Sequence, residues 1–372
     1  MEYYDDMSQI IKVLIISYYF PPSNSVGAVR MGALYNFLIK HGYEVKIICF
    51  DENSTSNPIN KTVKNKSIKK LRLSQYFRSI DKTVFSKFTF TNLKKIISYR
   101  NKYDIIICSY KPIASIILGI ILKILSNKTK LFIEYRDLIS QFGRKRKTFF
   151  FHKFDQLIDR FYSSFADELI SVSPTSRIKA EKFYQRKVNL IYNGIDFRKD
   201  YYRAPSGILK ILYSGSLSEV RNLKLITDHI LKSNLDIELI IASNENPKLF
   251  NGDFEFVKHV GFISREALEN KIKEVDFLLI LEGFDKDSEE NIPAKIFEYL
   301  SYNKPIMANC SPNSEIIKIL KETESGMNIN DFKDFDKLLR IKNFKVNKNI
   351  DLYSRENQFI KYINLINENI KT

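Results

Sequence analysis

The sequence alternates short, uninterrupted apolar runs with longer segments whose apolar residues recur at helical spacing. The first run, KVLIIS at 12–17, is followed by a loop rich in Pro, Gly and Ser, a helical pattern at 28–40 and a second apolar run at 44–50. Continuous apolar runs are typical of strands that are buried on both faces. A strand–helix–strand unit with such strands builds a parallel sheet, so the order predicts an α/β fold.

This alternation starts twice along the chain, which predicts two α/β domains of similar size. In the first half, further strands are expected at 103–109, 130–137 and 168–173, helices at 113–125, 152–166 and 174–184, a strand with a turn at 188–196, and loops with short helices at 51–100. A polar stretch at 198–207 contains Pro-Ser-Gly and is the expected linker. The pattern then restarts with ILKILYSGS, a helix from about Arg221 and the strand DIELIIAS.

We therefore predict domains at 1–200 and 201–350, followed by a long C-terminal helix at 351–372. Ligands of parallel α/β sheets bind beyond the carboxyl ends of the strands. Two such domains joined by one linker should hold their ligands in a cleft between these ends.

The charge is distributed unevenly between the two halves. Residues 1–200 carry 35 Lys and Arg against 17 Asp and Glu, whereas the remainder carries 24 against 26. The first half should therefore face an anionic partner such as nucleic acid, an acidic membrane surface or a phosphorylated acceptor. No RNP-like, zinc-finger or homeodomain pattern is present, so nucleic acid is not the expected partner.

Several features predict a cytosolic protein. The longest apolar stretch, at 112–125, has 14 residues, whereas a membrane-spanning helix needs about 20. The start, MEYYDDMSQI, is acidic and polar, the reverse of a secretion signal. Three scattered cysteines and four histidines without an HExxH pattern argue against a disulfide framework and against a metal site.

Two basic runs, at Lys61–Arg72 and at Arg144, Lys145, Arg146 and Lys147, lie near aromatic clusters at 149–151 and 161–162. Such runs are usually solvated faces. Basic and aromatic residues together also suit an anionic bilayer, so a protein resting on the inner face of the cell membrane is the second interpretation.

The segment SEENIPAKIFE contains two carboxylates at a Glu-x7-Glu spacing, Glu290 before a helix and Glu298 within it. A carboxylate offers two oxygens to a sugar diol. Lys295 is three residues before Glu298, so both can share one helix face. The spacing by itself fits an ordinary amphipathic helix after a solvated acidic loop at least as well.

Three other segments place chemistry-bearing residues beside strand ends. YSGSLSEVRNLK, with Gly215, Ser216 and Arg221, joins a strand to a helix and suits a diphosphate, although a plain strand–turn–helix fits too. Gly27 begins a helix where backbone can approach a ligand closely, and a plain turn is the alternative. Arg136 and Asp137 follow a strand, so they either face the cleft or form a structural ion pair.

Taken together, these segments resemble bacterial glycosyltransferases of family 4. The opening KVLIISYYFPPSNSVGAVR, VNLIYNGID, ILYSGS, the stretch Asn291–Glu298 and EYLSYNKPIMA carry the resemblance, which covers nearly the whole chain. It implies a GT-B fold, in which two Rossmann-like domains face a central cleft and a C-terminal helix crosses back to the first. It also implies a nucleotide-sugar donor, retention of anomeric configuration, no metal and no cofactor.

The resemblance also implies roles for single residues. Glu298 would bind the ribose, Glu290 with Asn291 and Ile292 the donor sugar, and Arg221 the diphosphate, while Gly27 would approach the donor from the first domain. Many relatives have a basic residue directly after the first glycine of the second domain, where this chain has Ser216 after Gly215. A second cation must come from elsewhere, with Lys295 and Lys224 as the candidates.

The implied reaction is transfer of a sugar to a lipid-linked glycan acceptor during synthesis of a cell-surface polysaccharide, capsule or lipopolysaccharide. Departure of a nucleoside diphosphate builds negative charge, which cations must stabilise. Glu290 and Arg221 are the expected catalytic residues, with Asp137 contacting the acceptor. Two alternatives stay open: a nucleotide-sugar isomerase (2-epimerase-like) of similar fold, and a non-catalytic module that binds a membrane surface.

Overall fold

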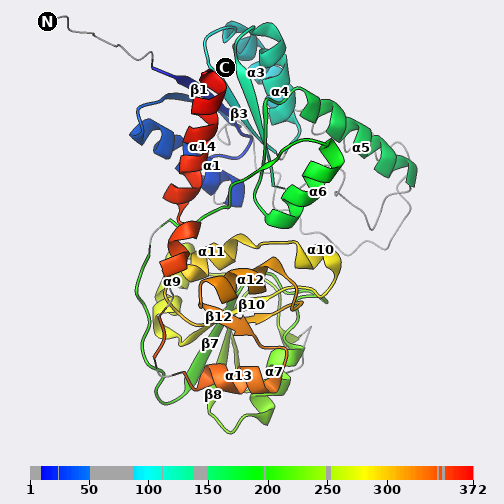
Figure 1. Ribbon diagram of the computed structural model, residues 1–372. Coiled ribbons are helices and arrows are strands. Elements are labelled where there is room, and N and C mark those ends of the chain that lie inside the picture. The colour runs from blue at the N-terminus through cyan, green and yellow to red at the C-terminus, as the bar shows by residue number, and fades with distance from the viewer. Residues whose placement is uncertain are drawn as a thin grey trace, which may run out of the picture. The chain divides into compact units, whose positions relative to one another are not determined.

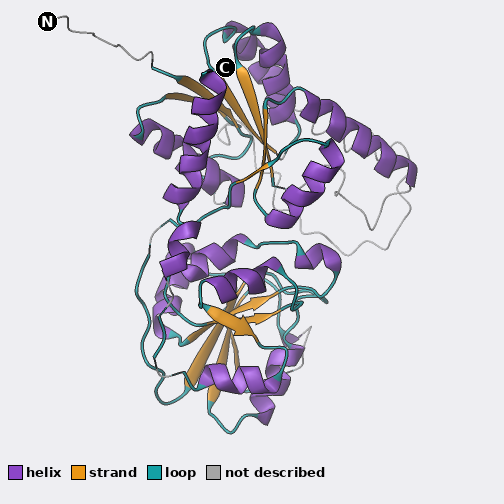
Figure 2. Ribbon diagram, viewed as in Figure 1, coloured by secondary structure: helices purple, strands orange, loops and turns teal. Residues whose placement is uncertain are grey.

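The computed structural model describes residues 10–23, 25–50, 87–110, 112–136, 149–196, 198–248, 253–341, 343–345 and 348–371. The chain forms two compact units, one from 1–192 together with 359–372, the other from 193–358. Each unit is a parallel α/β structure (Figure 1). Figure 2 shows helices lying against each sheet. The α/β class predicted from the alternating pattern is confirmed.

The first unit contains a sheet of six described strands in the order β2-β1-β3-β4-β5-β6, all parallel. Its strands are β1 (Lys12–Ile16), β2 (Glu44–Ile48), β3 (Ile105–Tyr110), β4 (Lys130–Tyr135), β5 (Glu168–Ser171) and β6 (Asn189–Leu190). Its helices are α1 (Val26–Lys40), α3 (Lys87–Ser98), α4 (Ala114–Leu125), α5 (Phe149–Ser164) and α6 (Pro174–Tyr184).

The second unit repeats this architecture with the strand order β12-β11-β10-β7-β8-β9. Its strands are β7 (Leu209–Ser214), β8 (Ile237–Ala242), β9 (Val257–His259), β10 (Phe277–Leu281), β11 (Ile306–Asn309) and β12 (Gly326–Asn328). Its helices are α7 (Lys224–Lys232), α9 (Arg265–Glu274), α10 (Lys286–Glu289), α11 (Ala294–Leu300), α12 (Glu315–Glu322) and α13 (Phe332–Leu339). A 3-10 helix (Lys348–Tyr353) leads into α14 (Arg355–Ile370).

Helix α4, the longest apolar segment, is a core helix of the first unit. Gly119 packs so closely on Cys108 of β3 that a methyl group at this position would overlap the sulfur atom. Most of α4 is buried, and Ile124 is among its few exposed apolar side chains. Among the helices described, none is long and apolar enough to cross a membrane.

The C-terminal helix α14 belongs to both units. It begins in the second unit, and from Phe359 onward it is part of the first. Phe359, Tyr362 and Ile366 are buried in the same apolar core as Val13 of β1, and Figure 1 shows α14 beside α1. The helix therefore returns to the first unit, as the resemblance to family 4 implied.

The division between the units differs from the predicted linker. It falls after Tyr192, and the polar stretch 198–207 lies inside the second unit. There Tyr201 stacks on Tyr302 with ring centroids 5.6 Å apart, and Lys199 bonds Glu269 at 2.6 Å. Polar composition suggested a free linker, but these side chains pack on their own unit.

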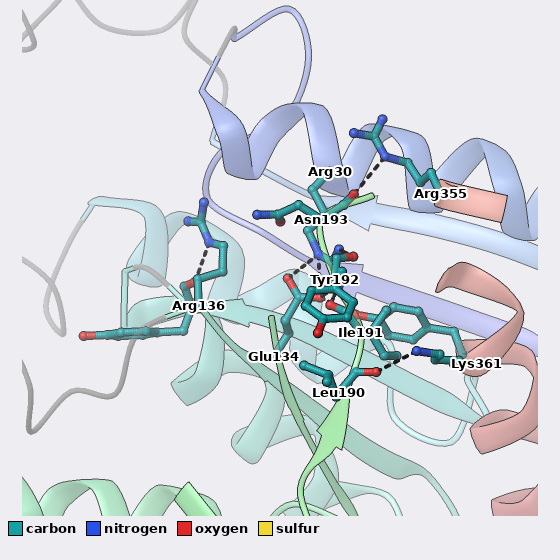
Figure 3. Close-up of polar contacts among 11 residues, drawn as sticks. Arg30, Glu134, Arg136, Leu190, Ile191, Tyr192, Asn193, Arg355 and Lys361 are labelled. Carbon is teal, nitrogen blue, oxygen red and sulfur yellow. Dashed lines mark hydrogen bonds and ion pairs between the residues drawn. The ribbon is translucent and has the colours of Figure 1, made fainter. Parts of the chain in front are cut away.

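In the segment 188–196, where a strand and a turn were expected, the strand is Asn189–Leu190. Beyond it, Ile191 still donates to the Ser171 carbonyl of β5 at 2.9 Å. Successive carbonyl oxygens from Leu190 to Gly194 accept hydrogen bonds from cationic side chains, and Figure 3 shows those of Leu190 and Asn193. Lys361 bonds Leu190 at 3.2 Å, Arg30 bonds Ile191 and Tyr192, and Arg355 bonds Asn193 at 3.1 Å and Gly194 at 3.5 Å. Gly194 has φ +76°, and a side chain there would overlap the Arg355 backbone, which explains the glycine of NGID.

Candidate functional site

The first loop of the second unit brings Gly215 against Lys295. Gly215 follows β7 and has φ +147°, a conformation that favours glycine. The Lys295 ammonium group lies where a side chain on Gly215 would be and donates to the Ser214 carbonyl at 2.8 Å. It also lies 4.9 Å from the centroid of the Tyr213 ring. Lys295 is therefore the cation beside this glycine.

Two tyrosines that sequence analysis did not single out hold this loop in place. The Tyr213 hydroxyl donates to the Ser216 carbonyl at 2.7 Å, and the Tyr299 hydroxyl bonds the Ser214 hydroxyl at 2.8 Å. Both side chains are fully buried. Their apolar rings suggested core packing, and nothing in the sequence pattern distinguished them from other core aromatics.

Lys295 has an unusual ammonium group. Its pKa is lowered to about 8, mainly by partial burial and also by the nearby Arg221, while Glu282 and Glu298 act in the opposite direction. A half-buried cation that no carboxylate contacts directly is costly, and such groups are often found where a ligand or a reaction needs them. The low pKa marks Lys295 as a functional candidate.

Arg221 is held by Glu282, the residue that follows β10. Its Nε and Nη2 atoms donate to the Glu282 carboxylate at 3.1 and 2.9 Å. The Glu282 side chain is 4% exposed and the Arg221 side chain 33% exposed, so the arginine is partly accessible to solvent. Glu282 lies at the carboxyl end of a parallel strand, where charged residues often face a ligand. Arg136 was a candidate for this reason, whereas Glu282 was not predicted.

The helix expected from about Arg221 begins at Lys224. Ser218 and Arg221 exchange backbone hydrogen bonds of 3.1 Å and form a turn that precedes the helix. Lys224, the other candidate for the second cation, is exposed. It lines a separate hollow of about 560 Å³ with Glu219, Asn222 and Asp285. Lys295, and not Lys224, therefore lies beside Gly215.

A hollow of about 250 Å³ lies beside Gly215 at the carboxyl ends of β7 and β8. Gly215 and Ser216 form one wall, and the loop after β9 supplies Phe262, which is 78% exposed. The remaining lining residues are Ser214, Ala242, Ser243, Asn244, Glu245, Ile263 and Leu268. The hollow thus combines polar strand ends with an aromatic ring and two aliphatic side chains.

Glu298 lies on α11, one turn beyond Lys295. Its carboxylate accepts from the Tyr302 hydroxyl at 3.2 Å and is 3.9 Å from Arg265, the first residue of α9. The side chain is 31% exposed. Helix α9 also carries Leu268 of the hollow, so Glu298 is linked to the wall of that hollow.

The adjacent acids Glu289 and Glu290 have different surroundings. Glu289 accepts from the Ser311 hydroxyl at 2.6 Å, which ties it to the loop after β11. Glu290 follows α10, Asn291 is exposed, and Ile292 is buried. The Ser311 bond gives Glu289 a structural role, while the donor-sugar role of Glu290 stays a prediction.

In the first unit, Arg136 and Gly27 meet. Arg136 donates from Nε to the Tyr110 carbonyl at 3.1 Å (Figure 3). Its guanidinium lies where a side chain on Gly27 would be. Gly27 is the second residue of α1, whose N-cap is Ser25. Gly27, expected to approach the donor, and Arg136, expected to face the cleft or to form an ion pair, are thus neighbours. Asp137, the basic residues Arg144, Lys145, Arg146 and Lys147, and the run 61–72 lie outside the described residues.

Glu134 of β4 has a structural partner that the sequence did not indicate. Glu134 is fully buried and accepts from Arg30 of α1 at 2.9 and 3.0 Å, and the Tyr362 hydroxyl of α14 also donates to it. Arg30 is itself 1% exposed. This buried cluster fixes α1, β4 and α14 to one another.

In the part of the chain described, no group of three or more His, Cys, Asp or Glu residues is placed to hold a metal ion.

Comparison with known proteins supports the resemblance to family 4 and identifies the fold. Residues 27–199 match the model of Glycosyltransferase Family 4. A search of curated protein sequences finds no match.

Among solved structures, the apo form of the lipopolysaccharide outer core galactosyltransferase WaaB has a TM-score of 0.64 at 15% identity, over 96% of this chain and 99% of that one. Anabaena Alr3699/HepE with UDP and glucose has a TM-score of 0.59 at 12% identity, over 96% and 100%. A structure titled as a UDP-N-acetylglucosamine 2-epimerase from Listeria monocytogenes has a TM-score of 0.56 at 12% identity, over 98% of this chain and 97% of that one.

The fold is GT-B, and the resemblance to glycosyltransferase family 4 is confirmed by the match over 27–199. The family match and the fold together support a glycosyltransferase of GT-B type.

Proposed function

We propose that the protein transfers a sugar from a nucleotide-sugar to a glycan acceptor, with retention of configuration and without a metal or cofactor. The observation that carries this proposal is the position of the Lys295 ammonium beside Gly215, a residue that lines the 250 Å³ hollow. A glycine without a side chain lets a phosphate approach the backbone closely, and the ammonium supplies the charge that Ser216 lacks.

The hollow is the proposed site of the nucleoside. Phe262 would stack on the base, and Glu298 would accept hydrogen bonds from the ribose hydroxyls. Arg221 has donors on the guanidinium edge that Glu282 does not occupy, and these would bind the diphosphate with Lys295. Glu290, Asn291 and Ile292 would hold the donor sugar, as the family resemblance implies.

The proposed chemistry follows from charge development. As the bond between the sugar and the diphosphate breaks, the leaving oxygen gains negative charge, which Lys295 and Arg221 would stabilise. The anomeric carbon becomes oxocarbenium-like. The acceptor hydroxyl then attacks from the face that the diphosphate leaves, and a leaving phosphate oxygen takes its proton. Glu290 would steady the positive sugar, and Asp137 would contact the acceptor.

The acceptor is proposed to be a lipid-linked glycan of capsule or lipopolysaccharide synthesis. The excess of Lys and Arg over 1–200 supports an anionic partner for the first unit, such as a lipid phosphate at the inner face of a membrane. The structural likeness to WaaB, a lipopolysaccharide galactosyltransferase, supports the same acceptor class.

A nucleotide-sugar isomerase is the second candidate, favoured by the structural likeness to the 2-epimerase. An isomerase converts its nucleotide-sugar without a glycan acceptor. Product analysis with and without acceptor therefore separates the two candidates.

Calorimetric titration with a panel of nucleoside diphosphates tests the donor site. We expect wild type to bind at least one, and Lys295→Met to weaken this binding at least tenfold, since a buried charge-assisted contact is worth about 1.5–3 kcal/mol. Lys224→Met is the matched control, because Lys224 is a lysine of the same unit that lines the other hollow. Equal effects of the two variants, or binding of no nucleoside diphosphate, would contradict the proposal.

A further inference from the structure

Strand β10 carries a buried acid at each end. Asp276 precedes the strand and Glu282 follows it, and each is 4% exposed. Each acid pairs with an arginine of the same unit, Asp276 with Arg203 at 3.5 Å and Glu282 with Arg221 at 2.9 Å. The two pairs are chemically alike, but only Glu282 lies at the carboxyl end, where Gly215 and Lys295 are.

Glu282 lies near two cationic side chains, Arg221 and Lys295. Its Oε2 atom accepts from Nε and Nη2 of Arg221, its Oε1 atom lies 2.9 Å from Nη2, and Arg221 keeps further N–H donors. Glu282 and Arg221 also act electrostatically on Lys295, with opposite signs. Two cations with one carboxylate leave a net charge of about +1 where the proposed diphosphate would bind.

We propose that Glu282 limits the affinity of this site for the leaving nucleoside diphosphate by neutralising Arg221, so that the product can dissociate. This inference rests on the proposed function. A nucleoside diphosphate carries more negative charge than the nucleotide-sugar from which it came. A site with two uncompensated cations would therefore hold the product more tightly than the donor and slow turnover at release.

The carboxylate also orients the arginine. A guanidinium held bidentately has a fixed plane, so its free edge points in one direction. Glu282→Gln keeps the size of the side chain and one acceptor oxygen, and it removes the negative charge. The variant therefore distinguishes the effect of the Glu282 charge from the effect of Glu282 on the orientation of Arg221.

The test compares nucleoside diphosphate and monophosphate binding by calorimetry in wild type, Glu282→Gln and Asp276→Asn. At an effective dielectric constant of about 20, removing one charge several Å from the diphosphate should tighten diphosphate binding about tenfold or more, with a smaller change for the monophosphate. Asp276→Asn, the matched loss of a buried acid, should leave both affinities unchanged. Steady-state kinetics of Glu282→Gln should show a lower kcat together with a lower KM for the donor.

A second variant covers the case in which Glu282→Gln fails to fold. Arg221→Met with Glu282→Leu removes both charges and keeps the net charge of the site, and replacing a buried pair by apolar residues is commonly tolerated. Because the double variant and Arg221→Met alone both lack the Arg221 donors, they differ only in the Glu282 charge, and the double variant should bind the diphosphate about tenfold or more tightly than Arg221→Met. Equal affinity of these two variants would contradict the inference. Unchanged or weaker diphosphate binding by Glu282→Gln, with binding by wild type intact, would overturn this inference alone. If wild type binds no nucleoside diphosphate, both the proposed function and this inference are contradicted.

Discussion

Lys295 and Gly215 are far apart in the sequence, yet the ammonium group of one fills the space that a side chain on the other would occupy. Each residue therefore constrains the other. The glycine is required both by its φ of +147° and by the lysine beside it. The lysine, in turn, obtains a carbonyl acceptor at Ser214 only because the loop turns at this glycine.

Gly215→Ala should therefore do more harm than backbone strain alone. Gly207 provides the matched control, because its φ is +68° and no atom lies within 4 Å of an added methyl group. Gly207→Ala should cost about 1–2 kcal/mol of stability and leave nucleotide binding intact. Gly215→Ala should displace Lys295 and weaken nucleoside diphosphate binding at least tenfold. Similar binding by the two variants would show that Lys295 does not act through this loop.

The lowered pKa of Lys295 predicts how nucleotide binding depends on pH. Only the ammonium form attracts the diphosphate, and its pKa is about 8 in the free protein. Affinity should be nearly constant from about pH 6.5 to 7.5 and fall by up to tenfold per unit above the pKa. Calorimetry across this range checks the slope, which Lys295→Met should abolish. A slope that persists in Lys295→Met would assign it to another group.

The same group should affect stability with a definite sign. The unfolded chain keeps the Lys295 proton up to pH 10.5, whereas the folded protein loses it near pH 8. The unfolded state therefore binds more protons between these values, and the cost of burying the lysine decreases as the pH rises through them. Lys295→Met should gain stability relative to wild type by more at pH 7 than at pH 9.5, as measured by urea unfolding. An equal gain at both values would contradict the lowered pKa.

Periodicity and local chemistry predicted most of the fold. The helix expected at 174–184 is α6 (Pro174–Tyr184), and the helical pattern at 28–40 ends where α1 ends, at Lys40. These features depend on neighbouring residues alone. The early end of the strand at Leu190 was not predicted. The carbonyl groups of Leu190, Ile191 and Asn193 accept from Lys361, Arg30 and Arg355, and these partners are distant in sequence.

The candidate site was predicted only in part, because its contacts also join residues that are distant in sequence. Lys295 was a candidate because it shares a segment with Glu298, yet its position beside Gly215 depends on how two strands are ordered. Glu282 gave no local signal beyond ending an apolar strand. The Arg30–Glu134 pair joins residues 104 positions apart, and single-residue patterns carry no information on such pairing.

The cluster of Arg30, Glu134 and Tyr362 predicts which substitutions detach α14 from the first unit. Glu134→Ala leaves Arg30 buried without its carboxylate and should cost about 3–5 kcal/mol. Tyr362→Phe removes one hydrogen bond and should cost about 1–3 kcal/mol. Denaturant unfolding measures both values, and hydrogen exchange should show faster exchange in α14. The double change Arg30→Met with Glu134→Leu should recover much of the loss, and failure to do so would argue against an electrostatic origin.

The uneven charge predicts reversible binding to anionic membranes through the first unit. Each surface Lys or Arg is worth about 1 kcal/mol near anionic lipid, and salt screens the attraction within about 8 Å. Changing Arg144, Lys145, Arg146 and Lys147 to Ser should reduce sedimentation with anionic vesicles. The control changes the exposed Lys232, Lys258, Lys318 and Lys333 of the second unit. Equal binding to neutral and anionic vesicles would contradict the membrane proposal.

The most direct test of glycosyl transfer is release of nucleoside diphosphate from a panel of nucleotide-sugars, measured with and without a lipid-linked glycan acceptor. The account predicts release from at least one nucleotide-sugar that increases with acceptor, a glycoside product of retained configuration by NMR, and loss of this release in Lys295→Met but not in Lys224→Met. Conversion of the nucleotide-sugar to an epimer without acceptor, or no turnover of any nucleotide-sugar, would contradict it.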